Sequence, residues 1–546
     1  MVLQACFKEK RRMKYLVLAI KHLIFPFLVL AAACAVAFSS LEPYIGSDFK
    51  NLIYLIPTIL SISFFLISIQ KDRRGEATSL FADANTNISK ELKRAMYPAI
   101  PANLLYKKPS GIVLGKQGSK YICIPLKSDG VNAFVVGTPG AGKSVMLKNI
   151  IVSNFTKQSL FNFFLIDIDG LIYKDLLPDR GCYEADWEEH IKVVDIPNRS
   201  SYGWDVFYQL REENLSETKK LKVVTDISEA LIEVTKENPY FSDNARKILT
   251  GVLLWGIEKG MDFVPIIQRL MRTTLSDLLD EIVGDAEANG WGIILDKIKS
   301  FVGKGENESI QDVEATLKQK LDVFSYPDIE YAFRTNPNRT SPKVLDDACT
   351  SLVFAPPTEM LLAYAPVFRL ITMQVLRHCE TAFPVSDERR TCIFIDEASR
   401  IGLVEGLADL MATGRKYGNN IFLFYQDLSQ FRDIYGKEKA ATIANLSELK
   451  LFLSGSGDKD TTDYLASMVG DYMTTSTSYE KSRLFGLQVS NKYSEEHRPI
   501  IDGQTMMQLR SKGELIAIYF GNYYRLKKVF YFNDKKLKRL SESLKK

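Results

Sequence analysis

The sequence lacks the features of a small secreted protein or a zinc-binding protein. Its seven cysteines are scattered along 546 residues, with no CxxC pair and no nearby histidines at metal-ligand spacing. Neither a disulfide framework nor a structural zinc site is indicated. Reduced thiols in the cytosol are the simpler interpretation.

A strong charge of one sign is also missing. The formal net charge is +4, from 70 Lys and Arg against 66 Asp and Glu. Affinity for nucleic acid depends on where cations cluster rather than on their total. The charge therefore neither identifies nor excludes a nucleic-acid partner.

Internal repeats and low-complexity tracts are absent as well. Hydrophobic residues make up 46% of the chain and charged residues 25%, which is ordinary for globular protein. The length is several times that of a single domain, so we expect one large domain with one or two smaller modules.

Short apolar runs alternate with helical stretches over most of the chain. This pattern predicts an α/β fold with a mostly parallel sheet covered by helices on both faces. The strand candidates are residues 133–136, 163–166, 191–194, 351–354, 391–395, 421–424 and 450–453, preceded by a hairpin of residues 111–115 and 121–125. We assign residues 76–211 and 327–546 to this domain.

Amphipathic helical patterns replace the strands between these two segments. We therefore predict an all-helical domain of residues 212–326 inserted into the α/β domain. Its helix candidates are residues 226–236, 242–259, 275–282 and 309–324. The basic tail of residues 535–546 also has helical character, and a solvated chain end is its simpler interpretation.

One segment matches the phosphate-binding pattern GxxxxGK[ST]. It consists of Gly137, Thr138, Pro139, Gly140, Ala141, Gly142, Lys143 and Ser144, between an apolar strand and a helix. In such a P-loop the backbone N–H groups surround the phosphates and the helix N-terminus adds a favourable dipole. Lys143 would reach the β and γ phosphates of ATP, and Ser144 would bind Mg²⁺. A fortuitous loop is a weak alternative in this context.

Two acids follow another predicted strand, at Asp396 and Glu397. A P-loop needs a carboxylate at a neighbouring strand end to hold Mg²⁺, which we assign to Asp396. Glu397 would polarise the attacking water. Gln426, at the end of a further strand, is a candidate to sense the γ-phosphate or orient water. A strand that ends in two solvated acids is the alternative.

The turn of residues 414–418 carries two cations between glycines. In a ring of subunits one of them could reach the γ-phosphate of a neighbour, and Arg415 is our candidate for this arginine finger. A plain surface cation is an equally good interpretation.

Two runs without charge lie near the N-terminus, at residues 23–41 and 52–69. Each is near the length that crosses a bilayer, so we expect a membrane anchor of residues 1–75 with two transmembrane helices. Basic residues flank the pair at Lys8, Lys10, Arg11, Arg12, Lys14, Lys71, Arg73 and Arg74. The positive-inside tendency then places both ends of the anchor in the cytoplasm and residues 42–51 outside.

A secretion signal is the alternative for this segment, because residues 31–34 loosely resemble a lipoprotein cleavage site. Cleavage there would export everything downstream, including the ATP site. A buried hairpin is also possible in principle, but two runs of this length with basic outer flanks favour the membrane.

The order of these motifs resembles that of the TraG/TraD-type coupling ATPases of type IV secretion and conjugation systems. The resemblance runs nearly end to end, from the two-helix N-terminus and the P-loop onward. Further matching segments are residues 111–115, 241–246, 394–397, 414–418, 426–430, 435–436 and 498–500. It implies a RecA-like homo-hexamer at the bacterial inner membrane, with its ATPase domain and the all-alpha domain in the cytoplasm. ATP hydrolysis with Mg²⁺ would drive delivery of relaxase-bound single-stranded DNA to the secretion channel.

This sequence departs from the family pattern in two places. Residues 167–170 read Asp-Ile-Asp-Gly where relatives often have Asp-Pro-Lys-Gly-Glu. The long acidic tail that some relatives use to recruit the DNA-processing complex is also missing. We therefore expect substrates to dock elsewhere, with the helical insert as the first candidate.

Two other functions remain open. A DNA translocase of the FtsK/HerA kind shares the motor, but predicts more membrane helices or a DNA-reading winged helix at the C-terminus. A secretion ATPase that handles only proteins is the other, and little in the residues excludes it.

Overall fold

The computed structural model describes Ile59 and residues 95–544. Gaps in that range fall at 127–129, 156–160, 177–189, 212–214, 235–238, 303–307, 348, 382–389, 401, 405, 455–457 and 481–489. Residues Met1–Ala95 and Met96–Lys546 form two compact units, and the second is described here. The two expected transmembrane helices lie outside the described residues, apart from Ile59. Within the described residues, every helix is too short or too polar to span a bilayer.

A nine-stranded sheet forms the centre of the second unit. Seven neighbouring strands are parallel, in the order β12-β4-β11-β10-β5-β9-β6, and β15 and β16 extend the sheet beyond β12 as an antiparallel hairpin. Their bounds are β4 Ala133–Val136, β5 Phe161–Ile166, β6 Ile191–Val194, β9 Ser351–Phe354, β10 Arg390–Ile395, β11 Asn419–Tyr425, β12 Leu449–Phe452, β15 Glu514–Tyr519 and β16 Asn522–Lys527. All seven predicted core strands are confirmed to within two residues.

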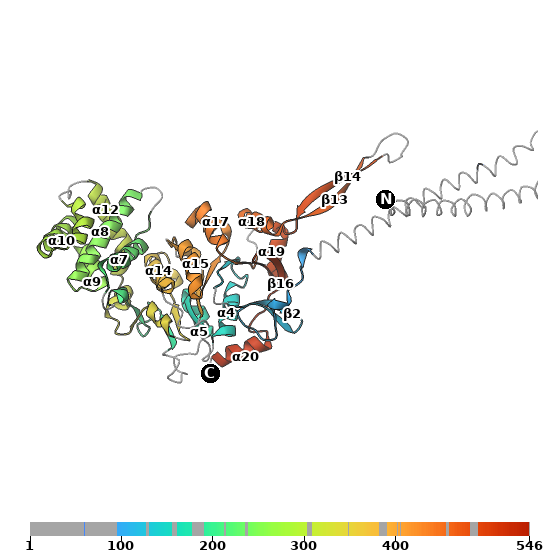
Figure 1. Cartoon of the computed structure of the whole chain (residues 1–546), viewed down its shortest axis with the longest axis horizontal. Coiled ribbons are helices and arrows are strands. Elements are labelled where there is room, and N and C mark those ends of the chain that lie inside the picture. Colours follow the sequence, from blue (N-terminus) through green and yellow to red (C-terminus); the bar gives the residue numbers. More distant parts are fainter. Residues whose placement is uncertain are drawn as a thin grey trace, which may run out of the picture. The chain divides into compact units, whose positions relative to one another are not determined.

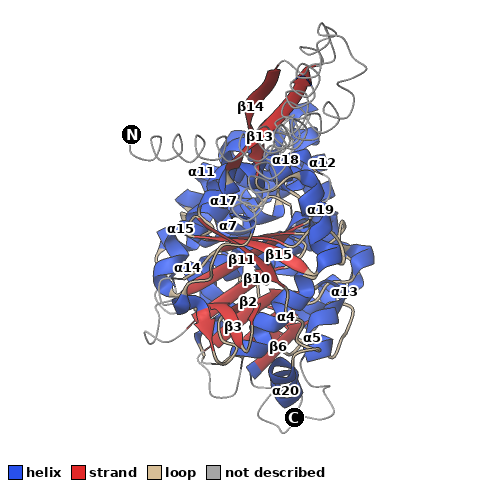
Figure 2. Ribbon diagram, turned by 90° about the vertical axis from the view of Figure 1, so that its right-hand side faces the viewer, coloured by secondary structure: helices blue, strands red, loops and turns tan. Residues whose placement is uncertain are grey.

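The parallel strands are apolar on both faces because helices cover both sides of the sheet (Figure 2). Side chains alternate between two cores: Phe134 and Val136 of β4 enter one, and Ala133 and Val135 enter the other. The helices of this α/β part are α4 Lys143–Asn154, α5 Leu171–Leu176, α14 Ala365–Thr381, α15 Leu407–Gly414, α16 Leu428–Tyr435, α17 Lys437–Asn445, α18 Lys459–Val469, α19 Gly503–Lys512 and α20 Lys535–Leu544.

The predicted N-terminal hairpin is present as a small antiparallel sheet. It consists of β1 Leu105–Tyr106, β2 Ile112–Gln117 and β3 Lys120–Ile124. The C-terminal α20 is helical as expected, but it is more than a solvated end. Leu537 and Leu544 are buried in the core that also contains residues of α4, because apolar side chains recur on one face of this basic helix.

Between residues 215 and 335 the described part of the chain contains helices and no strand. The elements are α7 Glu217–Leu231, α8 Pro239–Glu258, α9 Phe263–Arg272, α10 Leu275–Asn289, α11 Gly292–Ile298, α12 Glu308–Leu321 and α13 Pro327–Glu330, with short turns of other helix types between them (Figure 1). Our prediction for the first helix began nine residues too late. Ser216 accepts a hydrogen bond from the Lys219 amide, and this N-cap starts α7 at Glu217.

Two arginines tie the end of α7 to other helices. Arg246 of α8 donates from Nε to the Ile232 carbonyl at 2.6 Å. Arg369 of α14 donates to the Ala230 carbonyl at 3.0 Å and pairs with Glu233 at 3.3 Å. The last carbonyls of a helix lack intrahelical partners and carry negative partial charge, so both guanidinium groups stabilise this end. Arg246 belongs to the segment 241–246 whose motif the sequence singled out.

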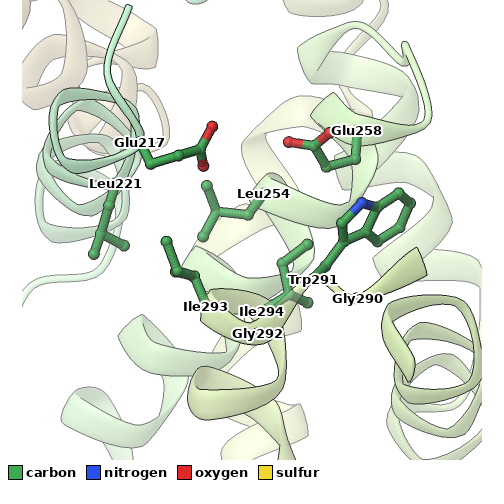
Figure 3. Close-up of a pocket in the computed structure, with 9 residues that line it drawn as sticks. All are labelled: Glu217, Leu221, Leu254, Glu258, Gly290, Trp291, Gly292, Ile293 and Ile294. Atoms are coloured by element: carbon green, nitrogen blue, oxygen red, sulfur yellow. The ribbon is translucent and has the colours of Figure 1, made fainter. Parts of the chain in front are cut away.

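A cavity of about 370 Å³ lies among the helices of the insert. Glu217 and Glu258 border it, with Leu221, Leu254 and Trp291 among the apolar side chains around it (Figure 3). Lys220 pairs with both carboxylates. None of the lining residues belongs to the P-loop, so this cavity is separate from the predicted nucleotide site.

Besides the hairpin of β15 and β16, one more antiparallel pair in the described residues was not predicted. Strands β13 Asp471–Glu480 and β14 Ser490–Pro499 pair over ten residues each. Their sequences are polar and rich in Ser, Thr and Glu, so they give no apolar strand signal. They connect α18 to α19.

Candidate nucleotide site

The loop of residues 137–142 connects β4 to α4 in the conformation that its glycines permit. Gly140 and Gly142 have φ angles of 73° and 101°, in the left-handed region that other residues avoid. The Ala141 amide donates to the Thr138 carbonyl at 3.0 Å, and this bond closes the turn. The loop therefore ends at the N-terminus of α4, where free N–H groups and the helix dipole favour an anion.

Neighbouring strands hold the base of this loop. The Gly137 amide donates to the Tyr425 carbonyl of β11 at 3.1 Å. Ser454, just after β12, accepts from the Thr138 amide at 3.1 Å, and its hydroxyl lies 2.7 Å from that of Thr138. Since β11 and β12 flank β4, the loop is fixed on both sides.

Three of the predicted catalytic side chains meet at the carboxyl edge of the sheet. Glu397 lies with one carboxylate oxygen 3.5 Å from Nζ of Lys143 and the other 3.3 Å from Nε2 of Gln426. Lys143 begins α4 and is 7% exposed, while Gln426 follows β11 and Glu397 follows β10. The structure thus brings together residues that are separated by up to 283 positions in the sequence.

Glu397 is held in an unusual backbone conformation. Its φ angle is 52°, in the left-handed region that a non-glycine residue seldom occupies. Such strain costs on the order of 1 kcal/mol or more and is found most often at functional sites. Here it accompanies a carboxylate that points to both the P-loop lysine and Gln426.

The adjacent Asp396 is buried at the end of β10. Burial raises the pKa of Asp396 to about 6, the neighbouring Glu397 carboxylate adds to the rise, and Lys143 opposes it. A buried carboxylate with an elevated pKa is one that a cation would stabilise in its charged form. Asp396 therefore suits a divalent ion.

A second buried carboxylate, Asp167, was not among our candidates. It follows β5, which pairs with β10, so it lies one strand away from Asp396. Burial raises its pKa to about 7 and the nearby Asp396 adds to the rise, while backbone N–H groups of Tyr173 and Ile172 oppose it. The signal that could have identified Asp167 is its place at the end of an apolar strand next to β10. Asp167 also belongs to the segment 167–170, which departs from the family pattern.

The residues fit a magnesium nucleotide. Ser144 lies exposed in the first turn of α4, and Asp396 ends a nearby strand. Among the described residues, no group of three or more His, Cys, Asp and Glu side chains could hold a metal alone. Mg²⁺ commonly keeps only one or two protein ligands beside substrate phosphates and water, so a hydroxyl and a carboxylate suffice.

Arg415 is not part of this cluster. It begins the turn before β11, at the amino ends of the parallel strands, whereas the P-loop lies at their carboxyl ends. There its guanidinium forms an ion pair with the carboxylate of Glu448. Within its own chain, Arg415 is therefore on the opposite edge of the sheet from the P-loop.

Two basic residues that the sequence analysis missed contact the P-loop. Arg510 of α19 donates from Nη1 to the Pro139 carbonyl at 3.3 Å. Lys528, after β16, donates to the carbonyls of Ala141 and Leu453, both at 2.7 Å. Burial lowers the pKa of Lys528 to about 8, and Arg510 adds to the effect. No local motif marks either residue, since each approaches the loop from elements far along the chain.

A parallel sheet with a P-loop at its carboxyl edge, and an acid pair on a nearby strand, defines the class of P-loop nucleotide-binding proteins. A family model described as type IV secretory system conjugative DNA transfer matches residues 182–546. This match covers more than half of the chain, and the protein belongs to that family.

Two relatives are similar to parts of this chain. Protein VirD4 of Agrobacterium fabrum is 27% identical over 197 residues, which are 36% of this chain and 29% of VirD4. Conjugal transfer protein TraG of Rhizobium radiobacter is 24% identical over 337 residues, 59% of this chain and 51% of TraG. The chain thus spans about half or less of the length of these two relatives.

Solved structures share the fold. Plasmid coupling protein TrwB in complex with a non-hydrolysable ATP analogue has a TM-score of 0.60 at 16% identity, over 80% of this chain and 96% of that one. TrwB in complex with ADP and Mg²⁺ has a TM-score of 0.58 at 17% identity, over 81% and 91% of the two chains. At this identity the likeness shows the fold, which is RecA-like α/β.

Proposed function

We propose that this protein is an ATPase and the coupling protein of a type IV secretion system. It would use ATP hydrolysis to deliver relaxase-bound single-stranded DNA to the secretion channel. The observation that carries the proposal is the convergence of Lys143, Glu397 and Gln426 at the P-loop in a member of this family. The complexes of TrwB with an ATP analogue and with ADP and Mg²⁺ support ATP and Mg²⁺ as the ligands.

The side chains at the P-loop would have separate roles in ATP hydrolysis. Lys143 lies 3.5 Å from a carboxylate oxygen of Glu397 and would reach the β and γ phosphates of ATP. Glu397 would accept a proton from the attacking water, and Gln426 would orient that water through its amide. Mg²⁺, held by Ser144 and Asp396, would neutralise charge on the phosphates.

We further propose that residues 1–75 anchor the protein in the bacterial inner membrane through two transmembrane helices. The two uncharged runs and their basic flanks support this arrangement. Residues 212–326 would form an all-alpha domain in the cytoplasm beside the RecA-like domain. In a homo-hexameric ring, Arg415 would act on the nucleotide of a neighbour rather than on its own.

The experiment is to measure ATP hydrolysis by the purified full chain in detergent with and without single-stranded DNA. Stimulation that is lost in Lys143→Ala is the expected result. If a hexameric preparation neither binds single-stranded DNA nor responds to it, the DNA-motor proposal is wrong. A protein substrate that stimulates hydrolysis instead would favour the protein-only secretion ATPase.

A further inference from the structure

Arg510 lies over the tip of the P-loop of its own chain. Besides the bond from Nη1 to the Pro139 carbonyl, its Nη2 lies 2.8 Å from the point where a Cβ atom on Gly140 would stand. Any side chain at position 140 would meet this guanidinium. The glycine thus leaves room both for the turn and for Arg510.

The position of Arg510 is fixed by the helix that carries it. Asp502 caps the start of α19 by accepting from the Thr505 amide at 2.8 Å. Met506 and Leu509 are fully buried on the inner face of the helix. Arg510 is a solvent-exposed residue, so a ligand can approach it.

Two positive charges lie near each other at this place, on Arg510 and Lys528. Among the described residues, neither Arg510 nor Lys528 has a carboxylate within ion-pair distance, although the chain forms many such pairs elsewhere. Two neighbouring cations without acids repel each other, and Arg510 contributes to the lowered pKa of Lys528. An anion bound at the loop would relieve that repulsion.

We propose that Arg510 is a nucleotide-binding residue that acts in cis, donating hydrogen bonds to the phosphate chain of the ATP or ADP held by the P-loop of the same subunit. A guanidinium binds phosphate oxygens through two parallel N–H groups, and such charge-assisted bonds are stronger than neutral ones. The inference rests on the proposed ATPase function. It adds an arginine whose contact with the loop does not depend on a neighbouring subunit.

The test compares three variants of the full chain by titration with ATP and with ADP. Arg510→Ala should raise the dissociation constant for both about tenfold, as expected for the loss of a charged hydrogen bond. Arg510→Lys should restore part of the affinity, because it keeps the charge but not the fork of donors. Lys512→Ala, at the end of the same helix, is the matched control and should bind like the unaltered chain.

A purely structural role would give a different result. Arg510 lies in the last turn of α19, where a cation also stabilises the helix dipole. If that is its role, Arg510→Ala will lower the melting temperature of the nucleotide-free protein and leave the affinity for ATP and ADP unchanged, and the inference is wrong. The inference instead predicts an unliganded melting temperature within about 2 °C of the original and a smaller rise on adding ATP.

The subunit in which Arg510 acts can be tested by mixing. Lys143→Ala subunits keep Arg510 but have an inactive P-loop. Arg510→Ala subunits lack this arginine but keep the lysine of the P-loop. Rings that contain both should hydrolyse no faster than the sum of the separate variants if Arg510 acts in cis. Recovery of activity in mixed rings would overturn the cis assignment. If the unaltered chain neither binds nor hydrolyses ATP, the proposed function itself fails.

Discussion

Glu397 combines a strained backbone with a carboxylate that contacts both Lys143 and Gln426. A carboxylate in this position can remove a proton from water. Glutamine is the neutral amide of the same shape, and it cannot act as this base. The side chain can therefore be examined without disturbing the loop.

Glu397→Gln should lower the rate of ATP hydrolysis by about 10²-fold or more while ATP binding persists, because general-base catalysis contributes about that factor. Steady-state hydrolysis and equilibrium binding of ATP measure the two effects. Glu438→Gln, at an exposed acid on α17, is the control and should leave both unchanged. Normal turnover in Glu397→Gln would remove this residue from the catalytic set.

Asp167→Asn should change how stability depends on pH. The pKa of Asp167 in the folded chain is about 7 against 3.8, so the folded chain keeps a proton that the unfolded chain loses. The free energy of unfolding therefore falls as pH rises through this interval, by about 1.4 kcal/mol for each unit of pKa difference at most. In the variant this decline should be weaker, and what remains would come largely from Asp396.

Denaturant unfolding of the nucleotide-free protein at several pH values between 5 and 8 measures this dependence. Asparagine keeps an oxygen that can accept from the Ile172 and Tyr173 amides, so the fold should persist. An unaltered decline in the variant would show that Asp167 is already ionised in that range.

At the scale of elements, helix α8 contains glycines where helix propensity disfavours them. A Cβ atom on Gly256 would lie 2.3 Å from Cγ1 of Ile266 on α9, so this glycine permits the two helices to approach closely. Gly284 of α10 is different, because a Cβ atom there would meet nothing within 4 Å. The two positions form a natural comparison.

Gly256→Ala should destabilise the protein by about 1–3 kcal/mol, since the added methyl overpacks the contact between α8 and α9. Gly284→Ala should stabilise it by about 0.5–1 kcal/mol, because alanine is the better helix former and the site is open. Thermal or denaturant unfolding of both variants distinguishes them. Equal effects of the same sign would contradict this account of the packing.

The elements that sequence reasoning identified were those with a local signal. Strands β4, β6 and β9 are short apolar runs, and the P-loop has its own pattern. Strand β15 carries such a run as well and was overlooked, whereas the polar strands β13 and β14 give none. The contact between Arg510 and Pro139 joins residues 371 positions apart, and no local pattern records it.

At the scale of the molecule, residues Met96–Lys546 form a compact unit by contacts among themselves. A fragment of these residues should therefore fold without the first unit and bind ATP with the affinity of the full chain. Circular dichroism with nucleotide titration measures both properties. Loss of ATP binding in a folded fragment would mean that the first 95 residues contribute to the site.

The chain between Ser454 and Arg510 begins and ends at the P-loop. At its start the hydroxyl of Ser454 contacts that of Thr138, and at its end Arg510 contacts the Pro139 carbonyl. Between these contacts lie α18, β13, β14 and most of α19. This segment is therefore attached to the loop near both of its ends. A phosphate that shifts the loop acts on both attachments at once.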